Sequence, residues 1–477
     1  MYYKSKDAYI ILLSVLLIFI IRSISFFIYD VYDDAFITFR YAYNLASGNG
    51  LVYNPGEYIL GTTSPLFAII IALFYKIGLS IPESVVVLNI LFDSITVFII
   101  SKFLIHSKKI IELGLFLFVF SGSVLISRIT AGGMEVNLFL LLSVLSINLY
   151  LKDKKILSFI LCSLSYFVRP ESISLLFILF INEIISKQYK KAFVLAIISI
   201  VTLSIPLYFI YNTYGNLLPQ SIVSKSELTG ASIFELINMF FLRDPFSIIT
   251  LPFALIGFTR INKTESFLKI YGFWIILLII SYFIIRPYPW PWYGFVIRVG
   301  FALFSGVGFV YVLSYFKNIE NYITFKKIIF ISVIIAISAN FITGYFQGFK
   351  PVTRNIYLSL KDWTEINNTG DKTLIADDIG IIGFLFKGYI YDTQGLISKK
   401  FVKKNERFEF FKSTSADFLF LNSNQENANL MFNTELNNYY QPIARFSKLG
   451  TKNITLNPKD YPHGWIQDYI LFKKLSD

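Results

Sequence analysis

The chain has 477 residues, of which 55% are hydrophobic, 18% aromatic and only 16% charged, and its mean hydropathy is +0.60. Soluble domains carry about a quarter charged residues, so this composition excludes an ordinary soluble protein and predicts many membrane-spanning helices. The net charge of +12 does not indicate nucleic-acid binding, because it comes largely from short lysine-rich loops between apolar segments.

A metal site built from sulfur or imidazole is not expected. The chain has one cysteine, Cys162, which lies in an apolar segment, and two histidines far apart in the sequence, His106 and His463. This excludes a disulfide framework and a thiolate metal site. A divalent cation such as Mg²⁺ or Mn²⁺, if one takes part, would need carboxylates and water as ligands.

Apolar segments predict about eleven membrane-spanning helices. The first, Ala8–Ile28, follows Lys4 and Lys6 and is not followed by a small-residue cleavage site. We therefore expect an uncleaved helix with a cytoplasmic N-terminus. The other spans are expected at residues 84–105, 110–128, 135–151, 156–168, 172–186, 192–211, 246–260, 266–286, 295–316 and 328–346.

The orientation of the whole chain depends on the apolar run Pro65–Leu79. If this run crosses the membrane, every later basic loop lies outside, and if it does not, all of them lie in the cytoplasm. The positive-inside rule favours the second choice, and a run of about fifteen residues is short for a span. We expect a helix at the outer membrane surface or dipping partway into it. The basic loops are Lys102/Lys108/Lys109, Lys152/Lys154/Lys155, Lys187/Lys190/Lys191, Arg260/Lys263 and Lys317/Lys326/Lys327.

This orientation predicts two domains, with the chemistry on the outer face. Residues 1–347 form the transmembrane module, and residues 348–477 are polar with short alternating segments, which predicts a small extracytoplasmic α/β domain. Strands are expected at Thr373–Ala376 and Tyr389–Tyr391, with a turn or helix at Asp378–Phe386. The outer loops carry Asp33 and Asp34, the turn from Thr130 to Glu135, Arg169-Pro-Glu171, residues 212–245 and the segment from Arg286 to Trp292.

Several of these residues have two interpretations. Asp33 or Asp34 can cap a helix whose apolar face carries Phe36, Phe39 and Tyr43, or can act as a carboxylate whose pKa is tuned at the membrane surface. Glu135 can favour a helix dipole or face a site. Arg169 and Glu171 can take part in a functional site or can form an ion pair at a helix break, and the sequence fits both interpretations equally well.

The remaining charged groups of the apolar segments, and the aromatic loop beside them, also allow more than one role. Asp93 can be a buried hydrogen-bonding residue or a functional acid, and Arg22 can extend outward to the interface. The Pro-Tyr-Pro-Trp-Pro-Trp-Tyr293 stretch is typical of an interfacial aromatic belt, or stacks on a sugar or prenyl chain. Arg286 and Arg298 flank it, and a guanidinium binds phosphate oxygens well.

An ordered set of motifs resembles one branch of the GT-C superfamily, which includes terminal arabinofuranosyltransferases of bacterial cell walls. The most specific is the first-loop string from Asp33-Asp-Ala-Phe-Ile-Thr-Phe-Arg40 to Glu57. The later motifs are Gly61-Thr-Thr-Ser-Pro-Leu66, Thr130-Ala-Gly-Gly-Met-Glu135, Arg169-Pro-Glu171, Tyr214-Gly-Asn-Leu-Leu-Pro219 with Lys225, and Asp378-Ile-Gly380 with Asp392-x-x-Gly-Leu396.

The resemblance implies a membrane enzyme that uses a polyprenyl-phosphate-linked sugar on the outer face of the cytoplasmic membrane. It implies that Asp33 is the general base, Asp34 its neighbour and Glu135 a second acid, with Asp34 and Glu135 the candidates for any metal. The acceptor would be a glycan, lipid or protein of the cell envelope, and neither sugar nor acceptor is specified. The expected donor-binding residues are Arg40, Arg169, Glu171, Lys225, Arg286 and Arg298.

Two other functions compete with this interpretation. A transporter or flippase of lipid-linked saccharides is expected to show paired half-repeats and charges near the membrane midplane. The sequence has no internal repeat, and its acidic motifs are predicted outside. A receptor or scaffold leaves the Asp33-Asp34 loop unexplained, so an enzyme is favoured.

Overall fold

The structure is a computed structural model that describes residues 5–226, 230–315, 352–398, 402–403, 406–422, 435–446 and 469–475, with several residues between 327 and 342. The chain forms two compact units. Unit 1 comprises Met1–Tyr29, Glu83–Ile210 and Leu228–Gln347, and unit 2 comprises Asp30–Pro82, Tyr211–Glu227 and Gly348–Asp477. The predicted boundary between residues 347 and 348 lies outside the described residues.

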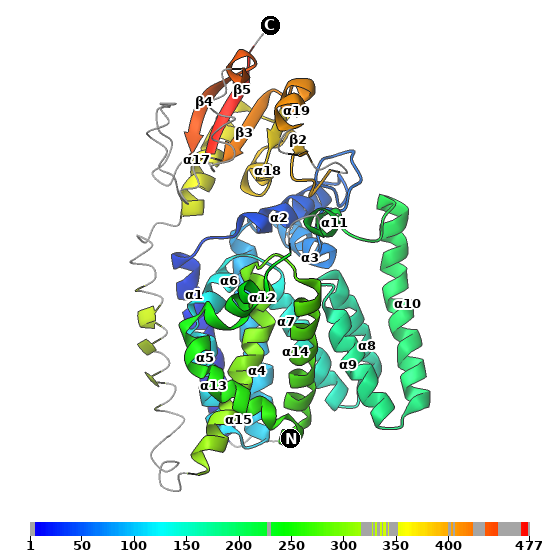
Figure 1. Cartoon of the computed structure of the whole chain (residues 1–477), viewed down its shortest axis with the longest axis vertical. Helices are drawn as coiled ribbons and strands as arrows, with labels where there is room; N and C mark the ends of the chain where they lie inside the picture. The colour runs from blue at the N-terminus through cyan, green and yellow to red at the C-terminus, as the bar shows by residue number, and fades with distance from the viewer. Residues whose placement is uncertain are drawn as a thin grey trace. The chain divides into compact units, whose positions relative to one another are not determined.

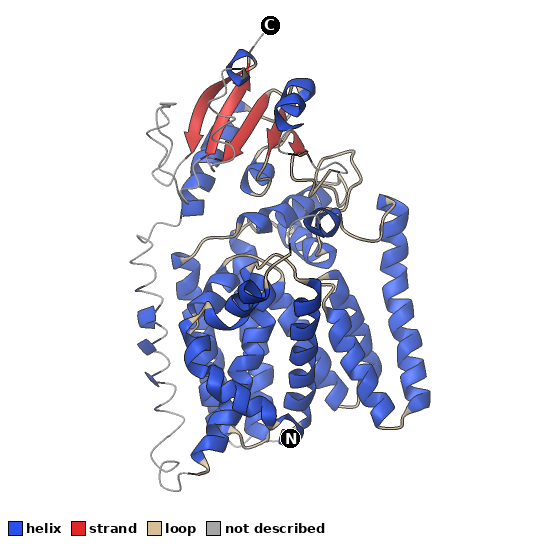
Figure 2. Cartoon of the chain, viewed as in Figure 1, coloured by secondary structure: helices blue, strands red, loops and turns tan. Residues whose placement is uncertain are grey.

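Unit 1 consists of apolar helices (Figures 1 and 2). Its longer helices are α1 (Ser5–Ile28), α4 (Glu83–His106), α5 (Ile110–Gly122), α6 (Val124–Ala131), α7 (Val136–Leu151), α8 (Lys155–Leu164), α9 (Ser172–Ile185), α10 (Tyr189–Tyr214), α13 (Pro245–Thr259), α14 (Ser266–Ile285) and α15 (Phe295–Leu313). Short helical turns are η1 (Ser165–Phe167), α12 (Ile233–Ile237), η2 (Asn238–Leu242), η3 (Ile261–Lys263) and η4 (Pro291–Gly294).

These helices make the protein a membrane protein with several spanning helices. Among the described residues, five helices are long and apolar enough to cross a bilayer, and up to seven spans result if each bent pair counts as one. The bent pairs are α5–α6, with a 62° bend, and the helix Ile233–Leu242 with α13, with a 94° bend. Each predicted span up to 295–316 coincides with such a helix, a bent pair or a shorter apolar helix, whereas most of 328–346 lies outside the described residues.

The helix α10 shows how apolar the surface of unit 1 is. Only Ala192, Leu195 and Ser199 are buried along its 26 residues, and large apolar side chains are exposed over its whole length. A helix that is apolar on every side is typical of a lipid-facing span. By contrast α13 and α15 approach closely at Gly257 and Gly308, where an added Cβ would overlap backbone atoms of the other helix.

Unit 2 contains a five-stranded mixed sheet with the strand order β2-β1-β3-β5-β4. The strands are β1 (Thr373–Ala376), β2 (Tyr389–Asp392), β3 (Phe418–Asn422), β4 (Tyr440–Phe446) and β5 (Tyr469–Lys474). β1 pairs in parallel with β2 and β3, whereas β5 pairs antiparallel with β3 and β4. The helices are α17 (Val352–Asn367), α18 (Ile381–Leu385) and α19 (Arg407–Thr414). The two predicted strands and the predicted turn or helix after Asp378 are confirmed.

Two helices of the first loop belong to the same unit. In α2 (Asp33–Ala46), Phe36 and Phe39 are buried, as the predicted apolar face requires. The helix α3 (Pro65–Lys76) packs against α2. Its 12 residues span about 18 Å, less than the roughly 30 Å of a bilayer core, and it is not among the candidate spans. This favours the expectation that the Pro65–Leu79 run does not cross.

The first loop covers the edge of the sheet. The Asn54 amide pairs with both backbone groups of Ile390 in the edge strand β2, at 2.9 Å and 3.1 Å. The Glu57 carboxylate accepts a hydrogen bond from the Tyr389 hydroxyl at 3.0 Å. An amide side chain that satisfies an edge strand in this way blocks pairing with another chain. The loop is therefore an integral part of the sheet unit.

Candidate functional site

The helix α2 carries a carboxylate, Asp33, and a guanidinium, Arg40, that lie at the two ends of α18. The two oxygens of Asp33 accept hydrogen bonds from the backbone N–H groups of Gly380 at 3.2 Å and Ile381 at 2.8 Å, where α18 begins. Arg40 lies seven residues later, on the same face of α2, and donates to carbonyls where α18 ends. A carboxylate at the N-terminus and a guanidinium at the C-terminus both complement the helix dipole.

Arg40 is a structural residue of unit 2. It is 4% exposed, and its five N–H groups all have oxygen partners: the carbonyls of Tyr53, Gly383, Phe386 and Gly388 and the Asn54 side chain. Its guanidinium also lies over the Tyr53 ring, 4.5 Å from the centroid. These contacts join the first loop to the segment after α18. All five N–H groups of Arg40 are thus used within unit 2, and the expected contact between Arg40 and the lipid donor stays a prediction.

A second carboxylate, which the sequence did not single out as a site residue, lies at the carboxyl edge of the parallel strands. Asp378 follows β1, and its Oδ2 accepts hydrogen bonds from Asn422 at the end of β3 and from Tyr469 at the start of β5, each at 2.9 Å. The carboxyl ends of parallel strands are a common place for sites in α/β proteins. The Asp378-Ile-Gly380 motif was the available signal, but it indicated only where the outer domain begins.

The environment of Asp33 changes its acidity. Burial of the carboxylate and the negative charge of Asp378 together raise the pKa of Asp33 to about 7, and the N–H group of Ile381 opposes the shift. A carboxylate with a pKa near 7 is a stronger base than an exposed one and is still ionised in part at neutral pH. Asp33 does not cap α2, because the N-cap residue is Tyr32 and no side chain bonds there.

Asp34 has a different partner. Its Oδ2 lies 3.4 Å from the Nζ of Lys225, and both side chains are 31% exposed. Lys225 belongs to α11 (Gln220–Ser226), which the backbone of Gln220 links to Leu60 of the first loop at 2.7 Å. The Ser224 hydroxyl bonds to the carbonyl of Gln394, beyond β2. Three motifs far apart in the sequence thus meet in unit 2.

In unit 1 the structure brings together three other predicted residues. Arg169 binds Glu135 through Nη1 and Glu171 through Nη2, each at 2.6 Å, and the Tyr282 hydroxyl donates to Glu171 at 2.9 Å. Glu135 and Arg169 are 4% and 7% exposed. The ion pair between Arg169 and Glu171, one of the two interpretations of that motif, is confirmed. Two carboxylates share one guanidinium, so the cluster carries a net negative charge.

The two arginines that flank the aromatic segment lie in different environments. Arg298 is 2% exposed and donates to the backbone carbonyls of Pro291 and Met239, so it ties η4 to the π-helical turn η2. Arg286 ends α14 in a left-handed conformation with φ 51°, and its side chain is exposed. Exposure leaves Arg286 accessible to a ligand, whereas Arg298 is buried among backbone carbonyls. Between them, the rings of Trp290 and Trp292 stack on each other with centroids 5.1 Å apart.

The described residues do not fit a metal site. No group of three or more His, Cys, Asp or Glu residues among them is arranged to hold a metal ion. The two carboxylates expected to bind a cation, Asp34 and Glu135, are bonded to Lys225 and Arg169.

No protein-family model matches the chain, and no curated protein matches it.

Proposed function

We propose that the protein is an integral-membrane glycosyltransferase that moves a sugar from a polyprenyl-phosphate donor to an acceptor of the cell envelope. The observation that carries the proposal is the assembly of unit 2. The Asp33-Asp34 motif, Lys225 and Asp378 come from segments up to about 345 residues apart in the sequence and form one charged cluster. Such a cluster of perturbed carboxylates beside a cation is typical of functional sites.

The reaction is an inverting single displacement. The acceptor hydroxyl attacks the anomeric carbon while Asp33 removes its proton, and the bond from that carbon to the lipid phosphate oxygen breaks. The polyprenyl phosphate leaves with the electron pair of that bond. A cationic side chain stabilises the charge that develops on the leaving phosphate. Lys225, which lies beside the carboxylate pair, is the proposed cation.

We also propose an eleven-span topology with unit 2 outside the cytoplasmic membrane. A compact unit cannot combine soluble segments from both sides of a bilayer, so the chain must cross an even number of times between those segments. Between Pro82 and Tyr211 it passes through α4, the α5–α6 pair, α7, α8 with η1, α9 and α10, an even number. After Glu227 the chain crosses the membrane through the α12–α13 pair, α14 and α15, which is an odd number of crossings. The span that the sequence predicts at residues 328–346 makes the number of crossings even.

A labelling experiment checks this topology. With cysteines at Ser107 or Ser413, an impermeant thiol reagent added from outside should label position 413 and leave position 107 unmodified. The native Cys162 is buried and gives little background. Ser413 is exposed on α19, whereas Ser107 lies in the first lysine-rich loop. Labelling at 107 with none at 413 would reverse the orientation.

The function itself is tested by the lipid that the protein binds. Mass spectrometry of the purified protein should find a co-purified polyprenyl-phosphate sugar, and added envelope glycans or lipids should convert it to the sugar-free polyprenyl phosphate. A flippase would bind the same lipid but leave it unconverted. A preparation that binds no lipid-linked sugar under any condition would exclude both functions.

A further inference from the structure

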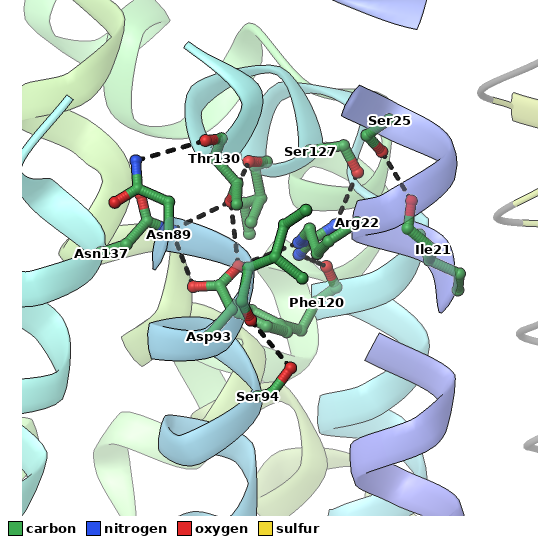
Figure 3. A network of polar contacts seen from close by, with 12 residues as sticks. Ile21, Arg22, Ser25, Asn89, Asp93, Ser94, Phe120, Ser127, Thr130 and Asn137 are labelled. Carbon is green, nitrogen blue, oxygen red and sulfur yellow. Dashed lines mark hydrogen bonds and ion pairs between the residues drawn. The ribbon is translucent and has the colours of Figure 1, made fainter. Parts of the chain in front are cut away.

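A fully buried ion pair lies within the apolar helices of unit 1. The Nε of Arg22 in α1 lies 2.9 Å from Oδ2 of Asp93 in α4, and both side chains are 0% exposed (Figure 3). The Arg22 side chain therefore does not extend outward to the interface, which was one interpretation of the sequence. A buried pair of this kind contributes little net stability, because both charges lose their hydration.

The other donors of Arg22 satisfy a break between two helices. Its Nη2 donates to the carbonyl of Phe120 at 2.7 Å, and its Nη1 to the Ser127 hydroxyl at 2.6 Å. Phe120 is in the last turn of α5, whose carbonyls have no partner further along the helix, and Ser127 is in α6. In an apolar environment an unsatisfied carbonyl is costly, so Arg22 stabilises the bend between α5 and α6.

Asp93 and Asn89, both in α4, hold the turn that follows α6 through hydrogen bonds. Asp93 accepts hydrogen bonds from Thr130 at 2.9 Å and from Asn137 at 2.8 Å (Figure 3). Asn89, one turn before Asp93 in α4, donates to the Met134 carbonyl at 2.8 Å. The turn from Thr130 to Glu135 is thus held at both ends by α4, and its last residue is the partner of Arg169.

We propose that Arg22, Asn89, Asp93 and Asn137 are positioning residues that hold the turn from Thr130 to Glu135 and so keep Glu135 bonded to Arg169. The proposal rests on the function proposed above and on the expectation, from the resemblance of the sequence motifs, that Glu135 is a second acid of the enzyme. Polar groups are an inefficient way to stabilise this region. The side-chain oxygens of Asn89 and Asn137 are buried and accept no hydrogen bond from the described residues, and apolar replacements of buried ion pairs are often as stable. The directional bonds to the turn are what apolar side chains cannot supply.

Hydrogen exchange of the whole protein in detergent tests this without any need for activity. The variants are Asp93→Asn and the apolar double variant Arg22→Met/Asp93→Leu, which removes both charges and should fold. Both should exchange backbone amides of residues 130–136 about tenfold faster or more, the equivalent of one lost hydrogen bond. Amides of α14 should be unaffected.

A matched control lies at the other end of α7. Lys155, which is partly exposed, and the fully buried Glu183 form an ion pair at 2.6 Å, and Glu183 also accepts a hydrogen bond from Tyr150. Glu183→Gln should leave exchange at residues 130–136 unchanged. Unchanged exchange there in both Asp93 variants would overturn the proposal, as would an equal increase in the Glu183 variant.

A kinetic measurement separates this proposal from the proposed function. In the double variant kcat should fall by about tenfold while KM for the lipid donor changes by less than about twofold, because a misplaced group slows the chemical step. Faster exchange with an unchanged kcat would show that the network holds the turn but that Glu135 takes no part in the reaction. If the wild-type protein has no transfer activity, the exchange experiment still decides whether the network holds the turn.

Discussion

Asp33→Asn is expected to lower the transfer rate by about a hundredfold or more, because an amide cannot accept the proton of the acceptor hydroxyl. The structure places the Asp33 carboxylate at the start of α18 and raises its pKa to about 7, so it is both ordered and basic. The measurement is kcat with a polyprenyl-phosphate sugar at saturating donor. The protein must remain folded and inserted for the comparison to hold.

A structural role for Asp33 makes a different prediction. An asparagine has one acceptor oxygen, so one of the two N–H groups of Gly380 and Ile381 would lose its partner, at a cost of about 1–3 kcal/mol. Asp392→Asn is a matched control, because the two oxygens of the Asp392 carboxylate each accept a hydrogen bond from a backbone N–H group of the same unit, from Gln394 at 2.7 Å and from Ile397 at 2.9 Å. Both variants should lose similar thermal stability, and only Asp33→Asn should lose activity. Equal activity in the two variants would leave Asp33 with a purely structural role.

The neighbouring carboxylate gives a second comparison. Asp34 bonds to Lys225 and is more accessible, so Asp34→Asn should impair binding of the phosphate more than proton transfer. If Asp34→Asn is inactive while Asp33→Asn turns over normally, the two roles must be exchanged. If both variants are active, the first loop is not the catalytic element.

The same carboxylate predicts a pH dependence. Because the base acts in its ionised form, kcat/KM should rise with pH through about 7 in the wild type, and the residual rate of Asp33→Asn should lack this step. The effect on stability has the opposite sign. A pKa raised above its unfolded value of 3.8 contributes stability that is fully present below about pH 4 and is lost as the pH rises through about 7.

The sequence predicted the local elements of unit 2 well, because each depends on a local pattern. Alternating side chains located β1 and β2, and the apolar spacing of Phe36 and Phe39 located α2. The packing partners could not be predicted in this way. That Asp33 and Arg40 lie at the two ends of α18 depends on a contact about 350 residues away, and nothing in the local pattern of α2 distinguishes a buried guanidinium from one that binds phosphate.

The buried network of unit 1 shows the same limit. Hydropathy located α1 and α4 and showed that Arg22 and Asp93 are unusual charged residues in apolar segments. It could not show that they bind each other, because the two residues are 71 positions apart in the sequence. The role of Arg298 was also not predictable. Its partners are backbone carbonyls at Pro291 and in the π-helical turn η2, whose irregular geometry has no sequence signal here.

The largest effect on stability is expected from Arg40→Met. Methionine retains much of the apolar stem, but it removes all five N–H donors and leaves the carbonyls of Gly383, Phe386 and Gly388 without a charged partner. Each buried carbonyl that stays unsatisfied costs about 1–3 kcal/mol. A total loss of about 3 kcal/mol should lower the Tm of unit 2 by roughly 6–12 °C. Scanning fluorimetry of the purified protein, combined with proteolysis of the sheet region, measures this loss.

Two further variants separate this role from donor binding. Arg40→Lys keeps the charge but offers three donors from a single atom, so it should fall between wild type and Arg40→Met in stability. Arg286→Met removes an exposed guanidinium and should leave the Tm unchanged. If Arg40→Met instead keeps its stability and raises KM for the lipid donor, the guanidinium must leave its carbonyl partners to bind phosphate. Arg40 would then be a donor-binding residue, as the sequence motifs predict, and not a structural residue. The first loop would be held to the sheet mainly by the hydrogen bonds of Asn54 to Ile390 and of Tyr53 to Ile379, which do not involve Arg40.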